Sequence, residues 1–219
     1  MLRKAPDNRN AQSLAVQFRR KRFAFFIALL SRLQKPVHIL DIGGTEAYWK
    51  MMGLDSSDQI FITVLNLTAN AVTLPYLTST VGDARHIDAG HNTFDIVFSN
   101  SVIEHVGTYE DQLQMANEAR RVAKRYFIQT PNKYFPLEPH FLFPFFQFLP
   151  LKAQTWLLQH FDLGWFTRTP DVQKAREIVA SIRLLDKTEL VALFPTANLY
   201  EEKVLGLTKS FVVCGGWSE

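Results

Sequence analysis

The chain has 219 residues, of which 47% are apolar and 21% are charged, and its formal net charge is +3. This length and composition fit one large α/β domain, and no internal repeat is visible. The single cysteine, Cys214, excludes disulfides and cysteine-cluster metal sites within one chain, and it favours a reducing, cytoplasmic setting. We expect no metal site. No stretch reaches the roughly 20 apolar residues that are needed to span a bilayer.

The basic residues are concentrated at the amino-terminal end. Residues 1–35 hold nine Lys and Arg side chains against one acid, Asp7. Helical spacing over residues 13–34 predicts a basic amphipathic helix, which we assign to a segment of its own, 1–35. Its charge favours a membrane surface or an acidic substrate, although a solvated helix face explains the same charges. The expected apolar face consists of Leu14, Phe18, Phe25, Leu29 and Leu33.

Apolar runs alternate with helical segments through the rest of the chain. The expected strands cover residues 37–42, 60–65, 79–81, 94–99 and 125–129, followed by a hairpin-like pair, 199–205 and 210–214. The expected helices cover residues 47–52, 109–123, 152–161, 172–181 and 188–194. This order predicts an α/β, Rossmann-like fold: a mostly parallel seven-stranded sheet with an antiparallel terminal strand and helices on both faces.

Short polar side chains follow the first four strands. The segment from Asp41 to Gly44 follows the first strand, and Asn66, Asp83 and Asn100 follow the next three. Glycines at positions 43 and 44 allow a tight turn and the close approach of a ligand. Each residue also has an ordinary explanation as a turn or strand end. Because the carboxyl ends of parallel strands share one edge of the sheet, we expect the group to form a ligand site.

These segments resemble the class I S-adenosylmethionine-dependent methyltransferases, in the branch that modifies small molecules. The resemblance covers about residues 36–132 and 186–215. It is carried by Asp41-Ile42-Gly43-Gly44, Gly82-Asp83-Ala84, Phe94-Asp95-Ile96-Val97 and Val102-Ile103-Glu104-His105-Val106. The chain departs from the family pattern at Thr45 and Ala47, which stand in the places of two loop glycines, and at Asn66, which replaces an acid.

The resemblance implies a methyltransferase domain over residues 36–219, with S-adenosyl-L-methionine as the cofactor and an activity of the EC 2.1.1 class. In such enzymes the glycine loop passes the methionine moiety, while the ends of the second and third strands bind ribose and adenine. The cofactor-binding positions implied here are Asp41, Gly43, Gly44, Thr45, Asn66, Leu67, Asp83, Ala84, Asn100 and Ser101.

An aromatic-rich insertion, residues 133–185, follows the fifth strand and is expected to cap the acceptor side. Its aromatic side chains either pack as a core or form a pocket or lip for a lipophilic acceptor, at a bilayer surface in the second case. Glu138 and His140 are fixed between prolines, so His140 is a candidate base for the acceptor. His105 is a second candidate, although the resemblance implies a mainly structural role for its segment.

We therefore expect a methyltransferase that acts on a small-molecule or lipid-like acceptor, lipophilic or aromatic. It is expected to be cytoplasmic, with peripheral membrane contact as a further expectation. One alternative is a catalytically silent cofactor-binding or scaffold protein, because two loop glycines and the ribose acid are missing. A nicotinamide-dependent oxidoreductase is another, although the chain lacks a Gly-x-Gly-x-x-Gly turn. No nucleic-acid partner is expected, because no basic and aromatic platform accompanies the basic arm.

Overall fold

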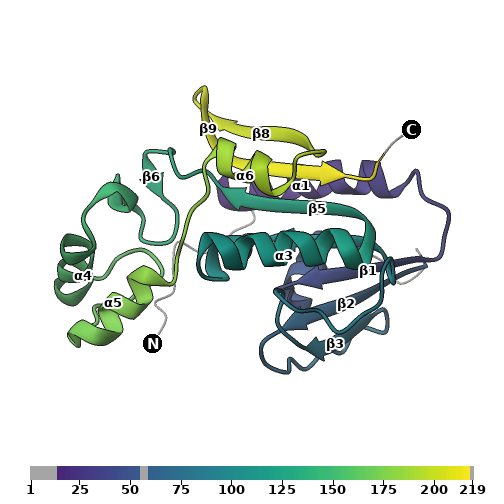
Figure 1. Ribbon diagram of the computed structural model, residues 1–219, viewed down its shortest axis with the longest axis horizontal. Helices are drawn as coiled ribbons and strands as arrows, with labels where there is room; N and C mark the ends of the chain where they lie inside the picture. The colour runs from purple at the N-terminus through teal and green to yellow at the C-terminus, as the bar shows by residue number, and fades with distance from the viewer. Residues whose placement is uncertain (1–13, 55–58, 218–219) are drawn as a thin grey trace.

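A computed structural model describes residues 14–54 and 59–217, and its centre is one seven-stranded sheet (Figure 1). The strands are β1 (Val37–Ile42), β2 (Ile60–Asn66), β3 (Leu77–Val81), β4 (Phe94–Asn100), β5 (Ala123–Pro131), β8 (Asn198–Val204) and β9 (Leu207–Gly215). They lie in the order β3-β2-β1-β4-β5-β9-β8. The first five are parallel, while β9 is antiparallel to β5 and β8 is antiparallel to β9. The predicted fold class is confirmed.

In the described part of the chain, six α-helices accompany the sheet. They are α1 (Leu14–Leu30), α2 (Glu46–Met52), α3 (Tyr109–Val122), α4 (Leu151–His160), α5 (Val172–Ala180) and α6 (Lys187–Leu193), with short 3-10 turns η2 (Ile103–His105) and η3 (Phe146–Phe148). Most predicted elements are displaced by only one or two residues. The largest differences are at β9, which begins at Leu207, and at α1, which ends at Leu30 rather than continuing to residue 34.

Helices cover both faces of the sheet, as predicted. On one face, Phe26 of α1 and Trp49 of α2 are fully buried in a cluster with Ile39 of β1. On the other face, Ala116 of α3 and Leu190 of α6 are fully buried in a second cluster. In Figure 1, α3 crosses in front of the sheet and α1 lies behind it. The central strands β1, β4 and β5 are therefore shielded from water on both sides, which explains their apolar runs, whereas the edge strand β3 is largely exposed.

The face that α1 buries differs in part from the predicted one. Leu29 is buried as predicted, but Phe18 and Phe25 are only half-buried, and Phe23 and Phe26 are the deeply buried aromatic residues. The ring of Phe25 contacts Tyr200 of β8, with ring centroids 4.5 Å apart. Because α1 contacts α2 and β8 as well as the sheet, more than one stripe of the helix is covered. Of the predicted basic arm, residues 1–13 and the side chain of Leu14 lie outside the described part.

The aromatic insertion begins and ends at one point of the main domain. Asn132 and Leu185 form a parallel bridge, and the backbone N–H of Lys133 donates to the carbonyl of Leu185 at 3.1 Å. Between them lie α4, α5 and a small hairpin of β6 (Leu137–Glu138) and β7 (Phe143–Pro144). The insertion has its own core, which includes the buried Phe141, Phe146, Leu158, Leu163, Ala175 and Val179. It stands beyond the carboxyl ends of the parallel strands (Figure 1).

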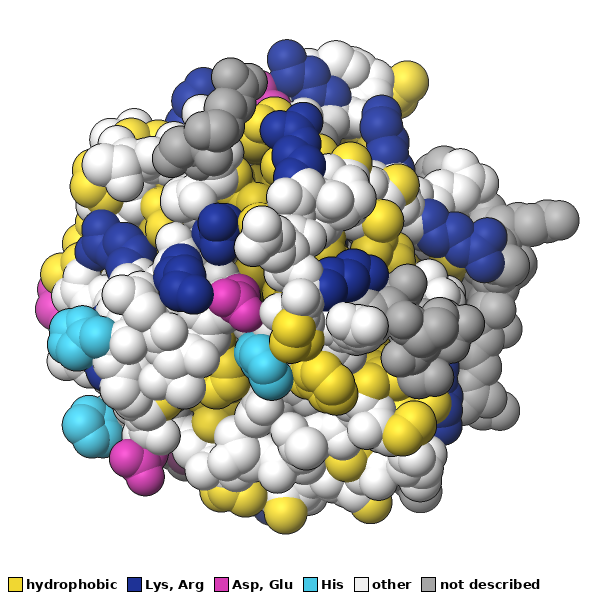
Figure 2. Space-filling model, turned by 90° about the vertical axis from the view of Figure 1, so that its right-hand side faces the viewer, with side chains coloured by type: hydrophobic (Ala, Val, Ile, Leu, Met, Phe, Trp, Pro, Cys, Tyr) yellow, Lys and Arg dark blue, Asp and Glu magenta, His cyan; other side chains and the backbone are white. Residues whose placement is uncertain are grey.

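The opposite end of the sheet, where the parallel strands begin, carries further basic side chains. Figure 2 shows Lys and Arg side chains spread over this end of the molecule. They include the exposed Arg32, Lys35 and Lys124, the last of which pairs with Asp95 at 3.1 Å. Basic charge is therefore not confined to α1. Among the described residues, no helix combines the length and the apolar character that crossing a membrane requires.

Candidate active site

The turn after β1 needs both of its glycines, because protein atoms crowd it. A Cβ at Gly44 would lie 1.8 Å from Oδ2 of Asp41. Gly43 has φ +72°, and a Cβ there would lie 2.5 Å from Cγ2 of Val102. A side chain at either position would therefore meet an atom of the domain itself. Asp41 and Val102 therefore crowd this turn, and the approach of a ligand to it stays a prediction.

Asp41 is a buried carboxyl group beneath this turn. Its side chain is 2% exposed, and its Oδ2 accepts a hydrogen bond of 2.7 Å from Nε1 of Trp49. Burial disfavours the charged form and raises the pKa of Asp41 to about 8, against the smaller opposing effect of the Trp49 hydrogen bond. Asp41 also lines the cavity described below.

The raised pKa of Asp41 predicts a pH-dependent stability. A carboxyl group that binds its proton more tightly when folded releases it on unfolding, so the free energy of unfolding falls as pH rises from 3.8 to about 8. The variant Asp41→Asn should remove part of this slope. Urea unfolding of ligand-free protein at about pH 5 and about pH 8 measures it. Asp88→Asn, at an exposed carboxyl, should keep the wild-type slope; an equal slope in Asp41→Asn would contradict the assignment.

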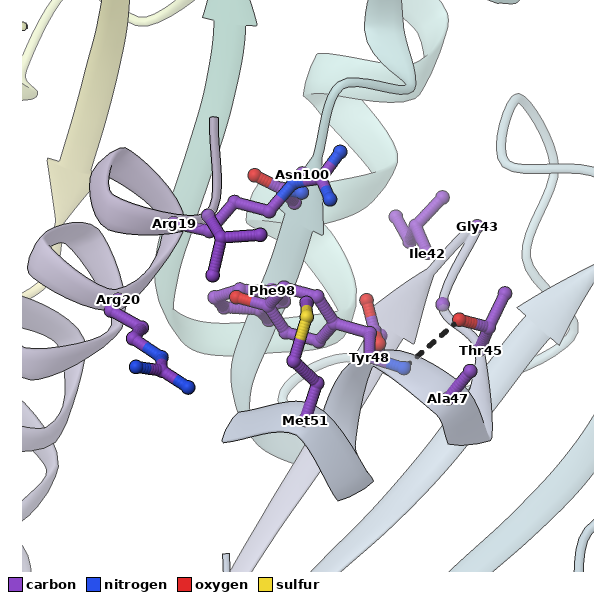
Figure 3. A pocket seen from close by; sticks show the side chains of 13 residues that line it. Arg19, Arg20, Ile42, Gly43, Thr45, Ala47, Tyr48, Met51, Phe98 and Asn100 are labelled. Carbon is purple, nitrogen blue, oxygen red and sulfur yellow. Dashed lines mark hydrogen bonds between the residues drawn. The ribbon is translucent and has the colours of Figure 1, made fainter. Parts of the chain in front are cut away.

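Two more of the predicted cofactor residues fix the same turn. Nδ2 of Asn66 donates to the carbonyl of Gly44 at 3.0 Å. Oγ1 of Thr45 caps the amino terminus of α2 by accepting from the backbone N–H of Tyr48 at 3.3 Å, as the dashed line in Figure 3 shows. Asn66 therefore ties the end of β2 to the glycine turn, and Thr45 ties this turn to the start of α2.

Asp83, after β3, is paired with an arginine. Nε of Arg85 lies 3.0 Å from both oxygens of Asp83, and a second guanidinium nitrogen of Arg85 lies 2.6 Å from Oδ2. Arg85 also binds Asp111 at 2.9 Å. Hydrogen bonds from Arg85 hold the pKa of Asp83 below its usual range, against a smaller effect of burial. Asp83 is thus a charged acceptor at the sheet edge, and its contact with an adenine amine stays a prediction.

Asn100 and Ser101, after β4, belong to a buried polar network that the sequence did not reveal. Nη1 of Arg22 donates to Oδ1 of Asn100 and, at 3.0 Å, to Oε1 of Gln129. Oγ of Ser101 donates to the same Gln129 oxygen at 2.8 Å. Arg22 also binds Glu202 with Nε at 2.9 Å. In the sequence, Arg22 cannot be distinguished from its basic neighbours Arg20 and Lys21, which are exposed, whereas Arg22 is buried.

Two cavities meet at the glycine turn, and both are lined by Ile42 and Gly43. The first, about 520 Å³, lies between α1, α2 and the ends of β1 and β4 (Figure 3), and the second, about 440 Å³, lies over the ends of β2 and β3. Of the predicted cofactor residues, the first cavity is lined by Asp41, Gly43, Gly44, Thr45 and Asn100, and the second by Gly43, Asn66, Leu67, Asp83 and Ala84. Ser101 lines neither of them.

The two predicted histidines are brought together beside the second cavity. The rings of His105 and His140 are nearly perpendicular, with centroids 4.9 Å apart. His105 lines the cavity, whereas His140 lines neither cavity. Nδ1 of His140 lies 2.7 Å from Oε1 of Glu138, and its Nε2 lies 4.0 Å from Oε1 of Glu104. The sequence predicts no metal site, yet Glu104, His105 and His140 are potential metal ligands in one place.

The charges of this cluster depend on one another. Burial raises the pKa of Glu104 to about 7 against the opposing charge of His140. Burial acts to lower the pKa of His140, but the hydrogen bond and charge of Glu138 and the charge of Glu104 outweigh it, so this pKa is raised. Desolvation and the neighbouring His140 lower the pKa of His105 to about 4, although part of the side chain stays exposed.

Comparison with known proteins identifies the kind of domain. Residues 40–126 match the model of the methyltransferase domain family. A SAM-dependent methyltransferase from Aquifex aeolicus is similar over 94% of each chain, with a TM-score of 0.53 and 12% identity. A protein from Rhodobacter sphaeroides described as a putative Zn-dependent alcohol dehydrogenase is similar over 86% of each chain, with a TM-score of 0.55 and 10% identity. At these identities the two structures establish only the fold.

A putative sarcosine dimethylglycine methyltransferase from Galdieria sulphuraria is 20% identical to the chain. The match covers 53% of this chain, the TM-score is 0.42, and the chain spans about half, 47%, of that protein. The curated proteins yield no match. The domain model thus matches the part of the chain that holds the glycine turn and strands β2, β3 and β4, and the SAM-dependent methyltransferase from Aquifex aeolicus is similar to it in fold.

Proposed function

We propose that this protein transfers a methyl group from S-adenosyl-L-methionine to a small, lipophilic acceptor. The observation that carries the proposal is the meeting of two cavities at Gly43, with Asp41 in the first and Asp83 in the second. An elongated ligand that passes over the glycine turn would reach both. This arrangement fits a molecule with an amino-acid end and a nucleoside end.

The residues in each cavity fit one end of this cofactor. In the first cavity, the buried carboxyl of Asp41 would bind the ammonium group, and the guanidinium groups of Arg19 and Arg20 would attract the carboxylate (Figure 3). In the second, Asn66 and Asp83 would bind the polar edges of the nucleoside. The cofactor supplies a methyl group on a sulfonium, and the residues of the chain position it and exclude water.

Aromatic side chains on the insertion support a lipophilic acceptor. Phe145 is 56% exposed, and Phe148 and Trp156 are about half exposed, although the buried core of the insertion does not need them. Exposed aromatic side chains are typical of a surface that binds apolar molecules. Peripheral membrane contact of the same surface stays a prediction, as does the role of His140 as a base.

Calorimetry with S-adenosylhomocysteine and with NAD tests the proposal. The wild type should bind S-adenosylhomocysteine and not NAD. Asp83→Ala should weaken binding about 10- to 100-fold, because a hydrogen bond to a charged group is lost. Asp88→Ala, at an exposed carboxyl five residues away, is the control and should bind normally.

Binding of NAD alone would contradict the proposal and favour the oxidoreductase alternative. A second measurement follows methyl transfer to phenols, quinones and fatty acids. Tight binding of S-adenosylhomocysteine without transfer to any of these acceptors would favour the catalytically silent protein.

A further inference from the structure

We propose that Glu104, His105 and His140 bind one divalent metal ion beside the second cavity. One potential ligand atom from each side chain lies within 4.8 Å of the other two. Nε2 of His140 is 4.0 Å from Oε1 of Glu104. A tetrahedral ion with bonds of about 2.1 Å holds its ligands about 3.4 Å apart. The three ligand atoms must therefore move only slightly closer together to bind one ion. Rotation of the partly exposed His105 side chain can bring its ring nitrogen closer to the other two atoms.

The carboxylate of Glu104 provides a second observation that points to a bound cation. The residue is completely buried, and its Oε1 has no hydrogen-bond partner among the residues that the structure describes. Oε2 accepts a hydrogen bond of 3.1 Å from Oγ1 of Thr130, which leaves Oε1 directed at the histidines. A buried carboxylate oxygen without a partner is costly, and coordination of a metal ion is one way in which proteins satisfy such a group.

Glu138 holds His140 in the orientation of a metal ligand. Its Oε1 is 2.7 Å from Nδ1 of His140, so this ring nitrogen carries the proton and Nε2 is left as the donor atom. Oε2 of Glu138 accepts the backbone N–H groups of His140 and Phe141 at 2.7 and 2.6 Å. A metal-binding histidine generally donates its other N–H to a carboxylate or carbonyl in this way.

The loop that carries His140 is fixed by a second segment of the insertion. The backbone N–H of Trp165 donates to the carbonyl of His140 at 3.0 Å, and its Nε1 donates to the carbonyl of Pro139 at 3.1 Å. A Cβ at Gly164 would lie 2.4 Å from the carbonyl oxygen of His140, so only glycine allows this close approach. His140 therefore reaches Glu104 from a loop that is held on both sides.

Two imidazoles and one carboxylate favour Zn²⁺ or Mn²⁺ over calcium and magnesium, which prefer sites made of oxygen atoms. Three protein ligands leave a coordination position open, as in catalytic metal sites. Because His105 lines the second cavity, that position is close to the proposed cofactor site. If the proposed methyl transfer is correct, an oxygen of the acceptor can occupy it. His140 then serves as a ligand, which differs from the role of base predicted from the sequence.

The test uses the full chain, treated with a chelator and then titrated separately with Zn²⁺ and Mn²⁺. We expect one ion per chain by calorimetry and by metal analysis of the isolated complex. His105→Asn, at a partly exposed side chain, should weaken binding more than the roughly 10- to 100-fold loss expected for Glu138→Gln, which acts through His140. His91→Asn, at an exposed histidine outside the cluster, should bind like the wild type. Circular dichroism confirms that each variant is folded.

Cobalt provides a readout that does not depend on affinity. Wild type loaded with Co²⁺ should show visible absorption bands that His105→Asn lacks. Failure of the wild type to bind stoichiometric Zn²⁺ or Mn²⁺ would overturn the proposal, as would unchanged binding by His105→Asn. Binding of S-adenosylhomocysteine is measured on the same samples: its absence from the wild type contradicts the proposed function but leaves the metal result standing.

Discussion

The variant Gly44→Ala is expected to lose measurable binding of S-adenosylhomocysteine. The new Cβ would lie 1.8 Å from Oδ2 of Asp41, which Trp49 holds in a buried position by a hydrogen bond. Asp41 cannot move away without breaking that bond, so the turn itself must shift. Because the two cavities meet at this turn, the shift should disrupt both ends of the site. We expect the dissociation constant to rise at least about 100-fold, or about 2.7 kcal/mol, in calorimetry.

Gly90→Ala is the matched control for this change. A Cβ at Gly90 would make only an ordinary contact, 3.4 Å from Oγ1 of Thr93, and Gly90 lines neither cavity. This variant should therefore bind S-adenosylhomocysteine as the wild type does. Wild-type binding by Gly44→Ala would show that the crowded turn does not position the cofactor.

The variant Arg22→Ala, in α1, is expected to be strongly destabilising. The Arg22 side chain is 5% exposed, and it binds Glu202, which is 13% exposed, together with Asn100 and Gln129. Its removal leaves the carboxylate of Glu202 buried without its cation. Breaking one side of a buried ion pair costs about 3–5 kcal/mol. Urea unfolding should show this loss in the free energy of unfolding.

Lys21→Ala is the control, because Lys21 is the preceding residue on the same helix and is exposed. Its stability should stay within about 0.5 kcal/mol of the wild type. If Arg22→Ala were equally stable, the network that joins α1 to β4, β5 and β8 would not hold the helix in place. A smaller second effect is expected on cofactor binding, since Arg22 also orients Asn100.

The strands and the row of residues at their carboxyl ends were predictable from local sequence. A strand covered on both faces is mostly apolar, so β1, β2 and β4 stand out as short, mostly apolar runs. In a parallel sheet, all strands end at the same edge, so the polar residue at the end of each apolar run lies at that edge. For this reason Asn66 and Asp83 could be assigned to one site before the structure was known.

Contacts between distant segments were not predictable in this way. Glu104 and His140 were each noticed, but no periodicity relates a 3-10 turn after β4 to a loop of the insertion. Arg22 resembles its solvent-exposed basic neighbours, and only its position on α1 relative to Glu202 places it inside. The approach of a ligand to Gly44 stays a prediction, and nothing in the sequence indicated that the side chain of Asp41, three residues earlier, crowds this position.

The bridge between Asn132 and Leu185 has a consequence for how such a protein can evolve. Since the two ends of the insertion are neighbours, the intervening loop can lengthen, shorten or be exchanged for another while β5 and α6 keep their places. Selection can thus alter the insertion, which we propose meets the acceptor, and leave the sheet around Gly43 intact. For the same reason, a protein engineer could replace the segment between Asn132 and Leu185 with a segment from another protein.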